Sequence, residues 1–174
     1  SQQKYGLYVP TSYTRGVDAP VIMILHGWGG AASSSFGTTL KTWANTNGWI
    51  MVKPEGRGWH QYDSASSTDL FEVLYDLDGA FGIDWTRIFS EGGSMGATGS
   101  FRHLARHPDV WTGAGGVDGW TDFRLWHKQW YSPQSYAWEF HPTFETCLDW
   151  SAPLTHAENI RANSTGPSSR MVTK

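Results

Sequence analysis

The chain has 174 residues, of which 39% are hydrophobic and 17% charged, a balance that excludes an intrinsically disordered chain. Its 13 Lys and Arg residues against 16 Asp and Glu residues give a formal charge of −3, without the basic excess of a nucleic-acid-binding surface. The longest apolar run, Val21 to Leu25, is too short to span a membrane. The single Cys147 excludes an intrachain disulfide and a cysteine-based metal cluster.

Apolar runs typical of strands alternate with helical patterns along the first two thirds of the chain. Residues 21–25 and 49–52 are continuous apolar runs, the pattern of strands buried on both faces of a parallel sheet. In chain order, we expect an edge strand at 5–10, strands at 21–25, 49–52, 86–90 and 112–117, and helices at 33–47, 69–81 (capped by Asp69), from after Gly96 to about His107, and 153–162. This alternation predicts an α/β fold with a mostly parallel sheet flanked by helices.

Aromatic side chains crowd the segment from 119 to 150, where the helical and strand patterns weaken. We expect at least one of them to stack on a sugar or ferulate-like ring and the others to pack. Residues 163–174 show no packing pattern and are predicted to be a tail or linker. The predicted organisation is therefore a core over 1–162, with an aromatic-rich insertion at about 119–150, and a tail over 163–174.

The nucleophile candidate is Ser94, in the G-x-S-x-G pattern Gly92-Gly93-Ser94-Met95-Gly96. A predicted strand precedes this pattern and a predicted helix follows at once. A sharp strand-to-helix turn would expose the serine hydroxyl at the edge of the sheet, where the helix N-terminus stabilises negative charge. The alternative is a glycine-rich turn with a serine that only caps the helix.

A second glycine loop, His26-Gly27-Trp28-Gly29-Gly30, follows the first buried strand. Ligands of parallel sheets lie at the carboxyl ends of strands, so its backbone can face a developing oxyanion. We expect the N–H groups of Trp28 and Met95 to form an oxyanion hole, with Gly29 as an alternative donor. His26 is expected to hold the loop by hydrogen bonds rather than to act as a base. The alternative is a plain turn between strand and helix.

With these motifs in order, the sequence resembles the α/β-hydrolase superfamily. It is most similar to the secreted esterase and prolyl-oligopeptidase-like branch, which includes feruloyl esterases and polyhydroxyalkanoate depolymerases. The resemblance covers about residues 4 to 162 and is carried by Tyr8 to Pro10, Val21 to Gly30, Pro54 to Gly58, Asp84 to Ile88, Gly92 to Gly96, Gly119 to Asp122 and Ser151 to Asn159. It implies acyl transfer through a covalent intermediate on Ser94, with a histidine as base, an acidic residue orienting it, and no cofactor.

In the family, the acid and the histidine come after a strand that follows the 151–159 segment. Nothing after Asn159 resembles a strand, so the resemblance implies a sheet without its last strands and a triad completed beyond residue 174. Three interpretations stay open: a piece of a larger hydrolase whose remainder is a second chain, a rebuilt triad, or a non-catalytic carbohydrate-binding or assembly module. The candidates for a rebuilt triad are Asp118, Asp122, His127, His141 and His156.

The sequence thus predicts a secreted serine hydrolase that cleaves carboxylic esters, with acyl or aromatic esters of polysaccharides as substrates. A serine peptidase of the prolyl-oligopeptidase type is the nearest alternative. Neither a nucleic-acid nor a membrane partner is expected, and no metal site, because His103 and His107 share a helical spacing without a third ligand. Those two histidines are predicted to be surface residues or partners of the helix dipole. Arg57 is expected in a structural hydrogen-bond network, with lining of the cleft as the alternative.

Overall fold

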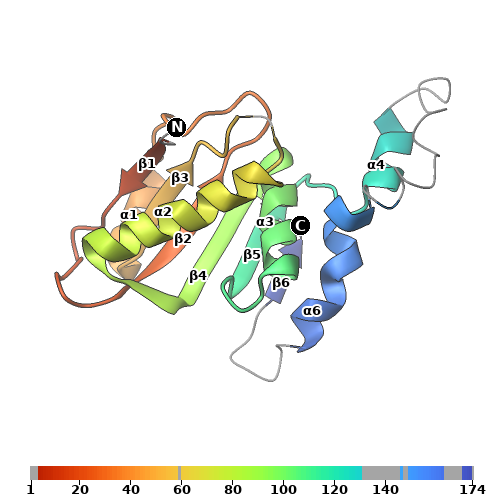
Figure 1. The fold of residues 1–174 in the computed structure, drawn as a ribbon. Coiled ribbons are helices and arrows are strands. Elements are labelled where there is room, and N and C mark those ends of the chain that lie inside the picture. Colours follow the sequence, from red (N-terminus) through yellow and green to blue (C-terminus); the bar gives the residue numbers. More distant parts are fainter. Residues whose placement is uncertain (1–3, 59, 131–145, 147–148, 163–169, 174) are drawn as a thin grey trace.

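A single mixed sheet organises the chain. The computed structural model describes residues 4–58, 60–130, 146, 149–162 and 170–173. Six strands form the sheet in the order β1-β3-β2-β4-β5-β6 (Figure 1). The strands are β1 (Tyr5–Tyr8), β2 (Ala19–Leu25), β3 (Ile50–Pro54), β4 (Ile83–Gly93), β5 (Gly113–Val117) and β6 (Arg170–Thr173). Only β1 runs antiparallel to its neighbour in this sheet, which confirms the prediction of a mostly parallel sheet.

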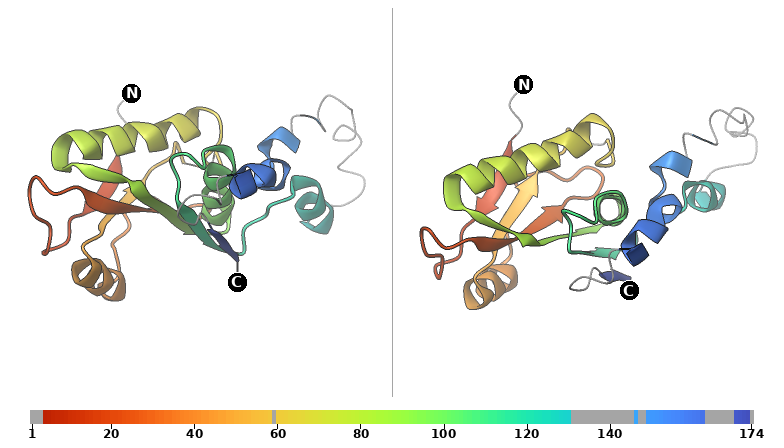
Figure 2. Two further views of the ribbon diagram at one scale, coloured as in Figure 1. Left: turned by 90° about the horizontal axis from the view of Figure 1, so that it is seen from below. Right: turned by 60° about the horizontal axis from the view of Figure 1, so that its bottom comes forward.

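Helices lie on both faces of the sheet. Helix α1 (Thr38–Asn47) covers one face, and α2 (Ala65–Phe81) and α3 (Met95–Arg106) cover the other (Figure 2). The 3-10 helix η2 (Pro153–His156) and α6 (Ala157–Ala162) lie beside α3, where the Asn159 amide donates a 2.9 Å hydrogen bond to the Ala105 carbonyl. Helix α4 (Phe123–Trp130) lies away from the sheet, and an ion pair of 2.6 Å joins its Arg124 to Asp149.

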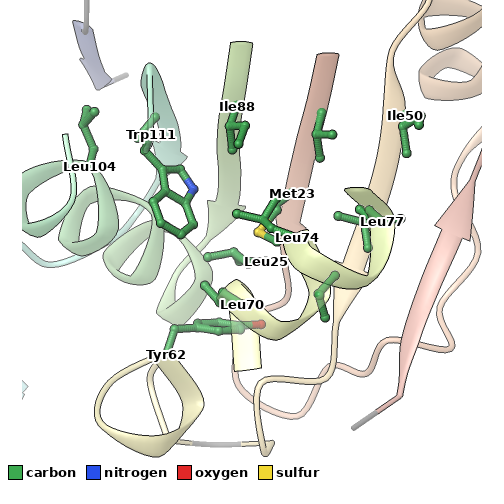
Figure 3. Packing of buried hydrophobic residues seen from close by; sticks show 14 of the residues in the cluster. Met23, Leu25, Ile50, Tyr62, Leu70, Leu74, Leu77, Ile88, Leu104 and Trp111 are labelled. Atoms are coloured by element: carbon green, nitrogen blue, oxygen red, sulfur yellow. The ribbon is translucent and has the colours of Figure 1, made fainter. Parts of the chain in front are cut away.

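The main hydrophobic core fills the space between the sheet and the helices α2 and α3 (Figure 3). Val21, Met23 and Leu25 alternate along β2 and are almost fully buried on this face. Ile22 and Ile24, on the opposite face of β2, pack with a smaller cluster around Met51. Since β2 and β3 carry apolar residues on both faces, their continuous apolar runs predicted their central place in the sheet.

Helix α1 begins at Thr38, later than the predicted start at residue 33. Lys53, at the end of β3, explains the difference, because its ammonium group donates to Ser34 Oγ at 3.1 Å and to the Ser35 carbonyl at 3.0 Å. It also lies 4.7 Å from the centre of the Phe36 ring. These contacts hold residues 34–36 in a loop, and the burial of Lys53 lowers the pKa of its ammonium group.

Helix α2 begins at Ala65, four residues before Asp69, so the predicted capping role of Asp69 is wrong. Asp69 is buried, and its Oδ1 accepts hydrogen bonds from Nε and Nη2 of Arg57. Ser64, Ser66, Ser67 and Thr68 hid the first turn of the helix, because Ser and Thr are weak helix formers.

The chain does form a strand after Asn159, against expectation. Within residues 163–174, predicted as a tail, β6 pairs in parallel with β5, from Gly113 opposite Arg170 to Gly116 opposite Thr173. A run of four residues is too short to show a strand period in the sequence. Its pairing is supplied by the backbone edge that β5 offers, which no side-chain pattern reveals. Among the described residues, no helix is long and apolar enough to cross a membrane.

Candidate active site

Ser94 is the single residue between the end of β4 and the start of α3, at the strand-to-helix turn that the sequence predicts. It is exposed and has a φ of 53° and a ψ of −119°, a conformation that costs a non-glycine residue about 1–3 kcal/mol. Its N–H donates a 2.8 Å hydrogen bond to the carbonyl of Val117, at the end of β5. The neighbouring strand therefore holds the backbone of Ser94 in the turn, while the side chain faces solvent.

The two outer glycines of the motif are required by the end of β2. A Cβ atom on Gly96 would lie 2.1 Å from the Leu25 carbonyl oxygen, and one on Gly92 would lie 2.6 Å from the same atom. A Cβ atom on Gly93 would meet nothing within 4 Å. The first turn of α3 thus presses against the backbone of β2, and this contact explains the spacing of the motif around Ser94.

The loop with Trp28 lies beside Ser94. The Gly30 N–H closes a four-residue turn by donating to the Gly27 carbonyl at 3.0 Å, and Gly29 has the positive φ of 76° that is typical of a type II turn. A Cβ atom on Gly27 would be 3.8 Å from the Cβ of Ser94. The Trp28 side chain is 64% exposed. Met95 begins α3, and the first N–H groups of a helix have no partner within the helix.

His26 holds the start of this loop, as predicted. Its Nε2 lies 3.0 Å from the Glu55 carbonyl, and its Nδ1 lies 2.9 Å from the Gly27 carbonyl. The hydroxyl of Tyr62, which is fully buried, donates to the His26 carbonyl at 3.3 Å. Burial raises the pKa of Tyr62, so this hydroxyl remains a donor. Both ring nitrogens of His26 are engaged with the backbone.

Of the candidates for a rebuilt triad, Asp118 directly follows the residue that holds the Ser94 backbone. Asp118 is exposed, has a φ of 58° and directly follows Val117, the hydrogen-bond partner of Ser94. Asp122 instead caps α4, because its Oδ1 accepts the Leu125 N–H at 3.1 Å.

The histidine candidates lie elsewhere or outside the described residues. His156 bonds the Trp150 carbonyl at 2.9 Å through Nε2, His127 lies in α4, and His141 and Cys147 fall outside the described residues. Among the side chains that the structure describes, no hydrogen bond joins a histidine to Ser94. Nor do three His, Cys, Asp or Glu residues of the described part gather closely enough to hold a metal ion.

The prediction of a surface position for His103 is wrong. His103 is 1% exposed; its Nδ1 lies 2.8 Å from the Gly99 carbonyl and its Nε2 lies 2.9 Å from Ser67 Oγ. Burial, as the main cause, lowers its pKa to about 3. Helix α3 packs against β4, β5 and η2, and Ser67 of α2 bonds His103, so even the polar residues of α3 are buried. His107 is half-buried. The centres of its ring and of the Phe71 ring are 4.9 Å apart, and the two rings are nearly perpendicular.

A partly buried charge cluster that sequence reasoning missed joins the 151–159 segment to α3. Asp63 forms ion pairs with Arg106 at 2.8 Å and Arg102 at 3.7 Å, and accepts a hydrogen bond from Ser151 Oγ at 2.7 Å. Burial alone would raise the pKa of Asp63, but Arg102 and the hydrogen bonds from Ser151 and Arg106 outweigh it and lower the pKa to about 2. No spacing in the sequence joins residues so far apart.

Arg57 belongs to a structural network, as expected, because it pairs with Asp69 at 2.9 Å. The Asp69 side chain is 1% exposed, so Arg57→Ala leaves a buried carboxylate without its partner. We expect a loss of about 2 kcal/mol in the free energy of unfolding, less than for a fully buried pair since Arg57 is 38% exposed. Urea unfolding measures this loss. Adding Asp69→Asn should recover part of it; a double variant no more stable than Arg57→Ala would contradict this account.

A comparison with known families decides the affiliation of the chain. A sequence model of the prolyl oligopeptidase family matches residues 36–170, which include Ser94, both outer glycines of its motif and the 151–159 segment. The chain belongs to the prolyl oligopeptidase family. A search of curated proteins found no significant match.

Solved structures of other proteins share the fold of this family member. FphF of Staphylococcus aureus, a fluorophosphonate-binding serine hydrolase, is 14% identical with a TM-score of 0.74, over 98% of this chain and 72% of that protein. A puromycin-hydrolysing peptidase of Mycobacterium tuberculosis is 18% identical with a TM-score of 0.73, over 98% of this chain but 28% of that protein. A ferulic acid esterase is 15% identical with a TM-score of 0.62, over 100% of this chain and 85% of that protein.

One of these neighbours is a serine hydrolase, and the other two are a peptidase and an esterase. The chain therefore has a serine hydrolase fold, as the resemblance in its sequence implied. At such low identity the likeness shows the fold, and the reaction has to be argued from the site.

Proposed function

We propose that this chain is the nucleophile-bearing part of a secreted serine hydrolase that cleaves carboxylic esters through an acyl-enzyme on Ser94. As Ser94 Oγ attacks the ester carbonyl, its proton passes to a histidine base, which the family resemblance places beyond residue 174. The base gives this proton to the alcohol as the tetrahedral intermediate collapses. Water then attacks the acyl-enzyme through a second tetrahedral oxyanion at the same position, and its proton passes through the base to Ser94 as the acid leaves. The N–H groups of Trp28 and Met95 stabilise that oxyanion, each such donor being worth about 3 kcal/mol in the transition state.

The observation that carries the proposal is the backbone of Ser94. An exposed serine held at φ 53° and ψ −119° between a strand and a helix costs stability, and strain of this kind is concentrated at functional sites. Gly27 also lies close to the Ser94 Cβ, so the backbone of the loop with Trp28 is near enough to supply a hydrogen-bond donor to the oxyanion. A serine that only capped α3 would bond the amides of the helix, and Ser94 makes no such side-chain bond.

The substrate is an acyl or aromatic ester linked to a polysaccharide. The ferulic acid esterase among the structural neighbours and the aromatic-rich segment after Trp120 support this choice. The rival is peptide-bond cleavage, which the match to the prolyl oligopeptidase family and the puromycin-hydrolysing peptidase favour.

A fluorophosphonate probe tests the nucleophile. The full chain should be labelled at Ser94, as mapped by peptide mass spectrometry, and Ser94→Ala should remove the label. Ser33→Ala, in a loop apart from the motif, is the matched control and should be labelled as the wild type is. No labelling of the intact, folded assembly, or labelling at another serine, would reject the mechanism and favour a non-catalytic binding module.

The rates of substrate hydrolysis then distinguish ester cleavage from peptide-bond cleavage. We expect faster hydrolysis of methyl ferulate and of feruloylated xylan fragments than of a peptide amide with the same acyl group. Preference for the amide would replace the esterase by a peptidase. Because a second chain is one interpretation of the sequence, an inactive but labelled chain would direct the search to its partner.

A further inference from the structure

Glu55 directly follows β3 and contacts both ends of the loop that carries Trp28. Its carbonyl oxygen lies 3.0 Å from Nε2 of His26, where the loop begins. Its carboxylate accepts a 2.8 Å hydrogen bond from the Ala32 N–H, where the loop ends. Glu55, just after the end of β3, therefore links the two ends of the loop.

The sheet fixes Glu55 in turn. Its N–H donates to the Lys4 carbonyl at 3.1 Å, which extends the pairing of β1 with β3 by one residue. Strand β1 also limits the far end of the loop, because a Cβ atom on Gly6 would lie 2.5 Å from the Ala32 carbonyl oxygen. Ala32 is buried. The far end of the loop is thus held between β1 and the Glu55 carboxylate.

The near end of the loop is held through Tyr62. Its ring is fully buried against two glycines, since Cβ atoms on Gly56 and Gly99 would lie 2.4 Å and 2.7 Å from ring carbons. Its hydroxyl bonds the His26 carbonyl. Between the two held ends, a Cβ atom on Gly29 would meet nothing within 4 Å, while one on Gly27 would lie 3.3 Å from the Gly93 carbonyl oxygen. The way in which the ends are held therefore contributes to the place of the Trp28 N–H relative to Ser94.

We infer that Glu55 is a positioning residue, whose carboxylate keeps the Trp28 N–H directed at the oxyanion that forms on Ser94. This inference rests on the proposed function. An oxyanion donor is effective only at hydrogen-bond distance from the developing charge, and a displacement of about 1 Å can cost about 100-fold in rate. The role needs an acceptor for the Ala32 N–H and does not need a negative charge.

The test compares Glu55→Ala, which removes the acceptor, with Glu55→Gln, which keeps an amide oxygen in its place. Glu72→Ala, an exposed glutamate on α2, is the control. With p-nitrophenyl acetate we expect Glu55→Ala to lower kcat by about 100-fold with little change in KM, the signature of a contact made in the transition state. Glu55→Gln should recover most of kcat. Hydrogen exchange at the Ala32 amide should be faster in Glu55→Ala and slow in Glu55→Gln.

Three results would overturn the inference: an unchanged kcat in Glu55→Ala, a kcat in Glu55→Gln as low as in Glu55→Ala, or equal protection of the Ala32 amide in all variants. Circular dichroism shows whether each variant is folded at the assay temperature. A wild-type protein that neither labels nor turns over as the intact assembly would refute the proposed function instead. The hydrogen bond between the Glu55 carboxylate and the Ala32 N–H would then be tested by hydrogen exchange at the Ala32 amide, a measurement that needs no enzymatic activity.

Discussion

Gly96→Ala is expected to lower the free energy of unfolding by about 3 kcal/mol or more, and with it the melting temperature by about 10 °C. The new Cβ atom would lie 2.1 Å from the Leu25 carbonyl oxygen and 2.7 Å from its carbon, both backbone atoms at the end of strand β2. A flexible side chain could move aside, but here α3 or β2 must shift. Thermal and urea unfolding followed by circular dichroism measure the loss.

The matched control is Gly93→Ala, in the same motif. Its Cβ atom would meet nothing within 4 Å, and Gly93 does not have a positive φ. We therefore expect no loss of stability, and a gain of up to about 0.5 kcal/mol from the smaller entropy of the unfolded chain. Any shift in Gly96→Ala would also displace Ser94, so fluorophosphonate labelling should fail in that variant alone. Equal stability of the two variants would refute the packing account of the motif.

Acidification is expected to destabilise the protein through His103. This histidine has a pKa of about 3 in the folded chain, below the ordinary value of 6.5 that it regains on unfolding. As the pH falls below 6.5, the unfolded chain binds a proton that the folded chain refuses. The free energy of unfolding then falls by up to about 1.4 kcal/mol per pH unit until about pH 3. Stability gained from a neutral His103 is thus complete above pH 6.5 and is lost on the acid side.

His103→Gln isolates this effect, because an amide can still accept from Ser67 and donate to the Gly99 carbonyl. Between pH 7 and pH 5, the wild type should lose about 2 kcal/mol more than the variant. The pKa of His107 is lowered in the same direction by its partial burial, and the comparison of variants removes its contribution. His60→Gln, at an exposed histidine, is the control. Parallel pH profiles of His103→Gln and wild type would contradict the prediction.

The elements that could be predicted are those whose own residue pattern indicates how they are buried. The runs at 21–25 and 49–52 are apolar at every position, and a strand covered on both faces is what they form. Ser94 was found for a similar reason, since the turn needs glycines two residues before and two residues after it, and Gly92 and Gly96 stand there.

What could not be predicted depends on contacts between distant segments. Strand β6 exists because β5 offers a backbone edge, and the burial of His103 follows from the packing of β4, β5 and η2 on α3 and from the contact with Ser67 of α2. The role of Glu55 is also hidden, because a loop glutamate in sequence is ordinarily a solvated charge. Only the fold brings its carboxylate to the Ala32 N–H. A sequence pattern indicates whether a helix or strand is buried, but rarely which other segments of the chain pack against it.

The strand order has a consequence for how the chain is made. On β2, Ile22 pairs with Met51 of β3 on one side and with Phe89 of β4 on the other. While a ribosome is still making residues 55–82, the nascent chain holds a hydrophobic central strand with one bare edge and no α3 to cover it. Pairing that spans so much sequence is slow to form and prone to aggregation. Chaperones that shield nascent chains should therefore matter most for this protein at the moment between the synthesis of β3 and that of β4.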